Sequence, residues 1–189
     1  MTRWFLAILV LVVTTAPVVG DRSAADRALR QGNRAEAVRI WTAQAAQGDR
    51  DAQHRLAYAF EEGIGAAADA VKAATYYRAA AEQGHGGAQT ALAAMLHEGR
   101  GVDRDDAEAF VWALAAARQG SAAAAHLLGR LYVSGEGVAA DPAEGFRWFL
   151  VAERHGHVSA AHDRRRYGRL VPIELRREIR TAVIQQIAY

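Results

Sequence analysis

The sequence predicts an all-α protein, a short α/α solenoid (superhelix) of helix-turn-helix repeats with a 36-residue period. Of its 189 residues, 44 are alanine and only three are proline, and alanine is the strongest helix former. The period is visible in columns of identical residues, among them Gly48, Gly84, Gly120 and Gly156, then Ala52, Ala88, Ala124 and Ala160. Tandem units of this length each form one hairpin and bury their apolar faces by stacking.

Residues 1–20 are predicted to be a secretory signal peptide rather than part of the fold. Arg3 supplies a positive start, an unbroken apolar run covers residues 4–13, and small residues lead to cleavage after Gly20. The alternative is an uncleaved membrane anchor. A spanning helix needs about 20 apolar residues, and residues 4–19 are fewer than that and are interrupted by Thr14, Thr15 and Pro17. We therefore expect an exported protein, periplasmic or secreted, with the anchored form as the alternative.

The rest of the chain divides by the period. Residues 21–51 form an N-terminal partial repeat, or cap, that turns at Gly32 and Asn33. Three full repeats follow, at residues 52–87, 88–123 and 124–159. Residues 160–189 are predicted to form arginine-rich capping helices, because Arg164 replaces the leucine of the repeat. A last helix is expected to begin at Pro172, with apolar residues on roughly one side: Ile173, Leu175, Ile179, Val183 and Ile187.

Within a full repeat, the first helix (52–62 in the first copy) carries Leu56, Ala57 and Phe60 on one face. A glycine is expected to stop it, because the residue after a helix often needs a positive φ. That glycine opens a Gly-x-Gly pair in each repeat: Gly63/Gly65, Gly99/Gly101 and Gly135/Gly137.

The second helices are predicted to begin after the N-cap residues Asn33, Asp69, Asp105 and Asp141. Glu36, Glu108 and Glu144 stand three residues later and predict capping boxes. Lys72 breaks this pattern in the first full repeat, so we expect a weaker cap there. One aromatic residue per repeat is expected to be buried between helices: Tyr76, Trp112 and Trp148.

These columns resemble the Sel1-like repeat, a relative of the tetratricopeptide repeat. The copy closest to its pattern runs from Ala124 to Gly156 and contains Leu128-Gly129, Tyr132, Gly135-Glu136-Gly137-Val138, Asp141 and Trp148. The resemblance covers about residues 33–161. It implies a solenoid that acts as an adaptor between proteins. Some cysteine-rich relatives were described as binding or hydrolysing β-lactams, a poor match for a chain without cysteine.

No catalytic, cofactor or metal site is predicted. The absence of cysteine excludes disulfides and thiolate zinc sites. The Gly-x-Gly pairs follow helices, whereas a dinucleotide fingerprint follows a strand. His54, His126 and His162 share one repeat column, so they lie on different hairpins, and stacked helices are about 8–10 Å apart, too far to share one zinc ion. The serines lack a nucleophile elbow.

By analogy with tetratricopeptide stacks, the first helices are predicted to line a concave face that binds a protein or peptide partner. The predicted groove suits an extended or helical peptide that is acidic toward its C-terminal end. The alternative is a solvated face without a ligand. Its residues are His54, Tyr58, Glu61, Thr90, His97, His126, Arg130, His162, Arg166 and Arg169.

The C-terminal segment is basic. Residues 160–189 hold seven arginines against three acidic residues, a formal charge of +4, within a chain whose net charge is +2. This segment is either a solubilising cap or a contact for an anionic surface; nucleic acid is disfavoured by the export signal. The sequence therefore predicts an exported, non-catalytic interaction scaffold of the cell envelope. The alternatives are an envelope hydrolase using the polar groove, or a module that binds an anionic polymer through the basic end.

Overall fold

The structure is a computed structural model that describes residues 22–186, so the predicted signal peptide (residues 1–20) and Ile187 lie outside the described residues. Within that range the chain is entirely helical, as predicted. The elements are α1 (Arg22–Arg30), α2 (Arg34–Ala46), α3 (Arg50–Glu62), α4 (Ala70–Glu82), α5 (Gly86–Glu98), α6 (Asp106–Arg118), α7 (Ala122–Ser134), α8 (Pro142–Arg154), α9 (Ala160–Tyr167), the 3₁₀ turn η1 (Gly168–Leu170) and α10 (Ile173–Gln186).

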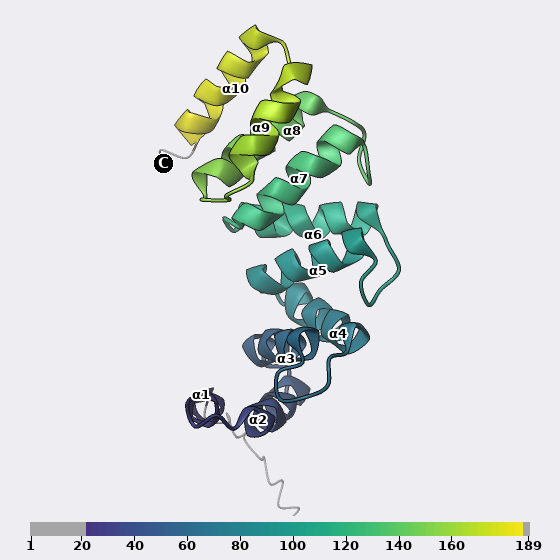
Figure 1. Ribbon diagram of the computed structural model, residues 1–189, viewed down its shortest axis with the longest axis vertical. Helices are drawn as coiled ribbons and strands as arrows, with labels where there is room; N and C mark the ends of the chain where they lie inside the picture. Colours follow the sequence, from purple (N-terminus) through teal and green to yellow (C-terminus); the bar gives the residue numbers. More distant parts are fainter. Residues whose placement is uncertain (1–21, 187–189) are drawn as a thin grey trace, which may run out of the picture.

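The helices form a solenoid. Figure 1 shows them succeeding one another along the long axis of the molecule, from α1 and α2 at one end to α9 and α10 at the other. From α1 to α9 each helix packs on the helices before and after it in this series, whereas α10 packs on α8, and the first helices α5 and α7 also touch each other directly. The core is accordingly a series of apolar clusters along the stack, rich in alanine, rather than one central core. Small side chains of this kind let neighbouring helices approach closely.

The first helices are capped by a column that the sequence analysis did not identify. The side chains of Asp49, His85 and Ser121 accept hydrogen bonds from backbone N–H groups at the starts of α3, α5 and α7. Because Asp49 caps α3, that helix begins at Arg50, two residues before the predicted start. A carboxylate, an imidazole and a hydroxyl each serve as the N-cap acceptor, so these three positions share no residue type by which the sequence could show them to be equivalent.

The second helices begin at the predicted N-cap residues. Of the two hydrogen bonds that make up a capping box, only the one accepted by the N-cap side chain forms, so the predicted boxes are wrong. Asn33, Asp69, Asp105 and Asp141 each accept a backbone hydrogen bond at the start of the helix that follows. The reciprocal bond from Glu108 does not form, because the N–H of Asp105 is already donated to the carbonyl of Leu96 in α5, 3.0 Å away. Glu108 instead pairs with Arg78 of the preceding repeat.

The cap at Asp69 is not weakened by Lys72 in the way the box pattern predicted. Asp69 accepts from the Lys72 N–H at 3.0 Å, and the Lys72 ammonium lies 3.0 Å from the same carboxylate. The first of these bonds is the main cause that lowers the pKa of Asp69. Since the other repeats do not use a glutamate to complete the box, Lys72 removes nothing from this cap.

Two of the three aromatic residues predicted to be buried lie at the seams between core clusters, and the third, Trp148, is half-buried against a single cluster. Tyr76 and Trp112 are each half-buried and pack against two neighbouring clusters, as bridges between repeats. The fully buried aromatic side chains are Tyr77, Phe146 and Phe149, and none of them occupies a position that is aromatic in all three repeats. Tyr76 and Trp112 therefore link the cores of neighbouring repeats.

Two buried glutamines connect three helices each. Gln53 of α3 donates to the carbonyl of Ala45 in α2 and accepts from Gln83 at the end of α4. Gln89 repeats this pattern with Ala81 and Gln119, at 3.1 and 2.8 Å. A buried amide must find partners, so these ladders favour one register between successive hairpins.

The second glycine of each Gly-x-Gly pair permits a close backbone contact with the preceding repeat. Gly101 has φ +73°, and a Cβ placed there would lie 2.2 Å from the carbonyl oxygen of Ala70, the first residue of α4. Gly65 and Gly137 approach α2 and α6 in the same way. Any side chain at these positions would force two hairpins apart.

The C-terminal end departs from the repeat. Arg164 pairs with Glu153 of α8, at 2.7 Å, in place of the expected leucine contact. Helix α10 packs on α8 through Ile179 and Val183. The prediction that Ile173 and Leu175 share this packed side is wrong: their exposed fractions are 51% and 36%.

Replacing Gly101 with alanine is expected to destabilise the fold far more than the same change at Gly84. Both have positive φ, but a Cβ at Gly84 meets nothing within 4 Å. Gly84→Ala should cost about 1–2 kcal/mol for the left-handed backbone alone, and Gly101→Ala about 2–5 kcal/mol with the added clash. Urea unfolding of both variants measures this difference. Equal losses would show that the close approach carries no energetic weight.

Candidate partner-binding face

One column of the predicted face makes side-chain contacts between successive repeats, and these contacts are here called joints. His54 stacks on His85, the cap of the next hairpin, with ring centroids 4.1 Å apart. Thr90 donates to Ser121 at 2.9 Å in the equivalent place. In the third repeat the stack returns, His126 on His157, again at 4.1 Å. These predicted residues therefore have a structural task, and His162, the fourth member of the column, is exposed.

Burial keeps the His54 ring neutral. Loss of solvent around the ring, followed by the proximity of His85 and Arg55, lowers the pKa of His54 to about 4. Burial, and then His126, likewise lower the pKa of His157. Asp163, whose carboxylate lies 2.8 Å from Nε2 of His126, opposes this lowering of the pKa of His157.

Glu61 is also engaged within the chain. Its carboxylate accepts a hydrogen bond from the Tyr77 hydroxyl at 2.6 Å and pairs with Arg100. Burial pushes the pKa of Glu61 upward, but the bonds from Tyr77 and Arg100 outweigh it and hold that pKa below its usual value. Arg100 is the middle residue of a Gly-x-Gly pair, so the loop of the second repeat here reaches the first helix of the repeat before it.

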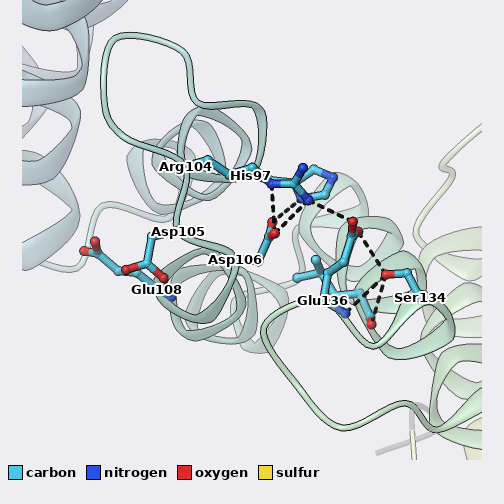
Figure 2. Close-up of polar contacts among 8 residues, drawn as sticks. His97, Arg104, Asp105, Asp106, Glu108, Ser134 and Glu136 are labelled. Atoms are coloured by element: carbon cyan, nitrogen blue, oxygen red, sulfur yellow. Dashed lines mark hydrogen bonds and ion pairs between the residues drawn. The ribbon is translucent and has the colours of Figure 1, made fainter.

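A polar network joins the second and third repeats (Figure 2). His97 Nδ1 lies 2.6 Å from Oδ1 of Asp106, and Arg104 is 2.7 Å from Asp106 and 2.8 Å from Glu136. Ser134 donates to Glu136 at 3.0 Å. Figure 2 shows the capping residue Asp105 pointing away from this network.

Beside this network lies an open pocket of about 470 Å³. It brings together two predicted residues, His97 and Arg130, and adds three that the sequence analysis missed, Glu98, Arg104 and Glu136. Arg130 is exposed, and no ion pair within residues 22–186 involves it. The pocket thus offers one available guanidinium beside charges that the chain itself holds in place.

The remaining predicted residues form two separate groups. Tyr58 is 49% exposed on α3. At the other end, His162, Arg166 and Arg169 line a second pocket with Arg165, of about 500 Å³. Most residues of the predicted face are therefore engaged in contacts between repeats. Three places on it remain accessible: Tyr58, the pocket at Arg130, and the basic pocket on α9.

Sequence reasoning missed the residues that link repeats because they occupy variable positions. The middle residue of Gly-x-Gly is Ile64, Arg100 and Glu136 in turn. Ile64 joins an apolar cluster, Arg100 pairs with Glu61, and Glu136 pairs with Arg104. The one available signal was the presence of charged residues between two structural glycines.

Three carboxylates on or beside this face have lowered pKa values. A general acid at neutral pH needs a raised pKa, yet hydrogen bonds and arginine neighbours lower the pKa values of Glu61, Asp106 and Glu108, although burial opposes this effect at each. In the described part of the chain, no three histidine or acidic side chains gather to hold a metal. None of the helices in residues 22–186 is both long and apolar enough to cross a membrane.

Comparisons with known proteins agree with this architecture. A family model of the Sel1 repeat matches residues 50–85, 87–121 and 122–157. The solved Sel1 repeat protein from Oxalobacter formigenes is 29% identical, with a TM-score of 0.67, and the match covers 75% of this chain and 56% of that one. The chain c5321, a protective antigen present in uropathogenic Escherichia coli strains displaying an SLR fold, is 24% identical, with a TM-score of 0.69.

The match to c5321 covers 86% of this chain and 40% of that one, and at this identity it shows the fold alone. This chain thus spans 56% and 40% of the lengths of the two solved proteins. No curated protein matches its sequence.

The free energy of unfolding is expected to fall as the pH is lowered from about 7.5 to about 5. The unfolded chain protonates His54 near its ordinary pKa of 6.5, whereas the folded chain does so only near 4. Stability is therefore complete above the unfolded value and is lost as the pH falls toward 4. We expect a loss of about 1 kcal/mol from this ring at pH 5, since solvent screens part of the effect.

Denaturant unfolding at both pH values tests this, with His54→Asn as the comparison. His157, whose pKa is also lowered, contributes in the same direction, and the carboxylates with lowered pKa values begin to contribute near pH 5, so the difference between the parent protein and the variant isolates the share of His54. The variant should lose part of the pH dependence. A variant with the same pH dependence as the parent protein would show that the lowered pKa of His54 does not contribute to the pH dependence of stability.

Proposed function

This chain belongs to the Sel1 repeat family, whose members commonly mediate protein–protein interactions, and from that premise we propose that it is a scaffold. It binds a protein partner through the face of its first helices, without a cofactor. The observation that carries this proposal is the pocket at Arg130, where an exposed guanidinium without an ion-pair partner among residues 22–186 stands beside a network held by ion pairs between repeats.

That pocket is suited to binding because its walls are already ordered. His97, Arg104 and Glu136 are held by one another before a partner arrives. Pre-ordered side chains lower the entropic cost of association. Arg130 and Tyr58 supply what interfaces use most, since arginine and tyrosine are enriched among the residues that dominate binding energy.

We further propose that the protein acts outside the cytoplasm, in the cell envelope. The support is the charged, apolar and small-residue order of residues 1–20, which is typical of a secretory signal. Residues 22–186 then form the exported scaffold. An anchored form, with the N-terminal segment retained, would present the same face.

The proposed role is non-catalytic. The alternative, an envelope hydrolase, would need a proton donor with a raised pKa on this face, and the carboxylates with resolved shifts there move in the opposite direction. The second alternative, a module for anionic polymers, depends on the basic C-terminal end and is separable from the pocket at Arg130.

Crosslinking of the tagged protein in intact source cells, followed by mass spectrometry, tests the scaffold. A partner from the envelope should copurify, and its recovery should fall at least about tenfold in Tyr58→Ala/Arg130→Gln. The control is Val111→Ala/Arg118→Gln, which changes two exposed residues of the second helix α6. A partner lost equally from both variants, or no partner above background, would contradict binding by this face.

A further inference from the structure

The C-terminal end contains two adjoining pockets lined mainly by arginine. The first, of about 380 Å³, lies between α9 and α10 and is lined by Phe146, Arg164, Arg165, Arg169, Ile173, Arg176, Arg177 and Arg180. The second is the pocket of about 500 Å³ on α9 described above. Arg165 and Arg169 line both, so the two pockets adjoin, and together they are here named the α9–α10 cleft.

Most of this positive charge is not neutralised by the protein. Arg164 pairs with Glu153, and the guanidinium of Arg166 lies 5.2 Å from the ring centre of Tyr167. No ion pair within residues 22–186 involves the other arginines of the cleft: Arg165, Arg169, Arg176, Arg177 and Arg180. Nε of Arg176 is buried without a hydrogen-bond partner. Like charges held this close repel one another, so an anionic ligand would relieve a cost that the free protein carries.

The arginines lie on two helical segments. Arg165 and Arg169 are four residues apart across α9 and η1, and Arg176 and Arg180 are four residues apart on α10. Side chains at this spacing share one face of a helix. Guanidinium groups therefore reach the cleft from both sides, and each can bind a carboxylate with two parallel hydrogen bonds.

The cleft also has apolar surface. Ile173 lines the first pocket together with the arginines, and Phe146 borders the same pocket but is only 2% exposed. Ile173 is 51% exposed, although it begins the helix that packs on α8. A small inorganic anion would leave this exposed side chain uncovered. The cleft therefore favours a ligand that carries apolar side chains among its charges.

We propose that the α9–α10 cleft binds an acidic peptide segment of a protein partner, with carboxylates on Arg165, Arg169 and Arg176 and an apolar side chain on the exposed Ile173. This inference rests on the proposed function, since His162, Arg166 and Arg169 belong to the predicted face. It adds the chemistry of the ligand and places it at the C-terminal end of the solenoid. The apolar contact separates it from a site for polyphosphate or for lipid headgroups.

The experiment uses purified residues 21–189 and a fluorescein-labelled peptide of about twelve residues that repeats Glu-Glu-Leu. Binding is followed by fluorescence anisotropy. The same peptide with glutamine in place of glutamate tests the charge, and polyglutamate of equal length tests the apolar contact. Inorganic polyphosphate and phosphatidylglycerol vesicles are competitors that represent the two other sources of anionic groups.

The Glu-Glu-Leu peptide should bind more tightly than polyglutamate, and the glutamine peptide should not bind. Arg165→Gln/Arg169→Gln should weaken binding at least about tenfold, and Ile173→Ser by about threefold for the leucine-containing peptide only. Affinity should also fall as the salt is raised from about 0.05 to about 0.5 M. Thermal unfolding of each variant checks its fold; the substituted side chains are exposed and unpaired.

The matched control is Arg30→Gln/Arg118→Gln, which removes the same charge from two exposed, unpaired arginines outside the cleft. Equal weakening by the control would mean that net charge alone attracts the peptide, which would overturn the site. No effect of Ile173→Ser, with polyphosphate or vesicles competing fully, would overturn a peptide ligand. Because none of these variants alters Tyr58 or Arg130, the cellular crosslinking can succeed while this inference fails, and the reverse also holds.

Discussion

The close backbone approach at the second glycine of each Gly-x-Gly pair is the constraint on which the rest of the structure depends. At Gly101 this loop meets the first residue of the preceding second helix so closely that a Cβ would lie 2.2 Å from a backbone oxygen. The same contact recurs at Gly65 and Gly137, so each hairpin is set at a defined place against the one before it. The residue between the two glycines is thereby carried across the boundary between repeats, where it becomes part of the neighbour's surface.

The candidate face follows from that placement. Arg100 reaches Glu61, and Glu136 reaches Arg104, because their loops are held against the preceding repeat. These ion pairs order the walls of the face and also occupy much of its charge. What remains accessible for a partner is a small set of side chains, chiefly Tyr58 and Arg130, and this combination of fixed walls and few available groups is what a rigid binding surface requires.

The C-terminal end shows what happens where the stacking stops. Arg164 takes the leucine position and pairs with Glu153, and α10 covers α8 through Ile179 and Val183. With no further hairpin to receive them, the polar side chains of α9 and the exposed Ile173 surround an open cleft. The end of the solenoid therefore combines a cap for the core with a basic surface on which Arg164 alone of the lining arginines has an ion-pair partner within residues 22–186.

The sequence by itself determined the fold class, the repeat period, the second-helix caps and the glycine stops, because each depends on local backbone chemistry that recurs every 36 residues. It also located the columns of the candidate face. Only the tertiary structure decided which of those residues are joints, as His54 is, and which remain accessible, as Arg130 does. It likewise decided that Glu108 pairs with Arg78 instead of closing a capping box. The physical reason is that these contacts join residues about 30 positions apart in neighbouring repeats, and their partners occupy columns whose residue types vary from one repeat to the next.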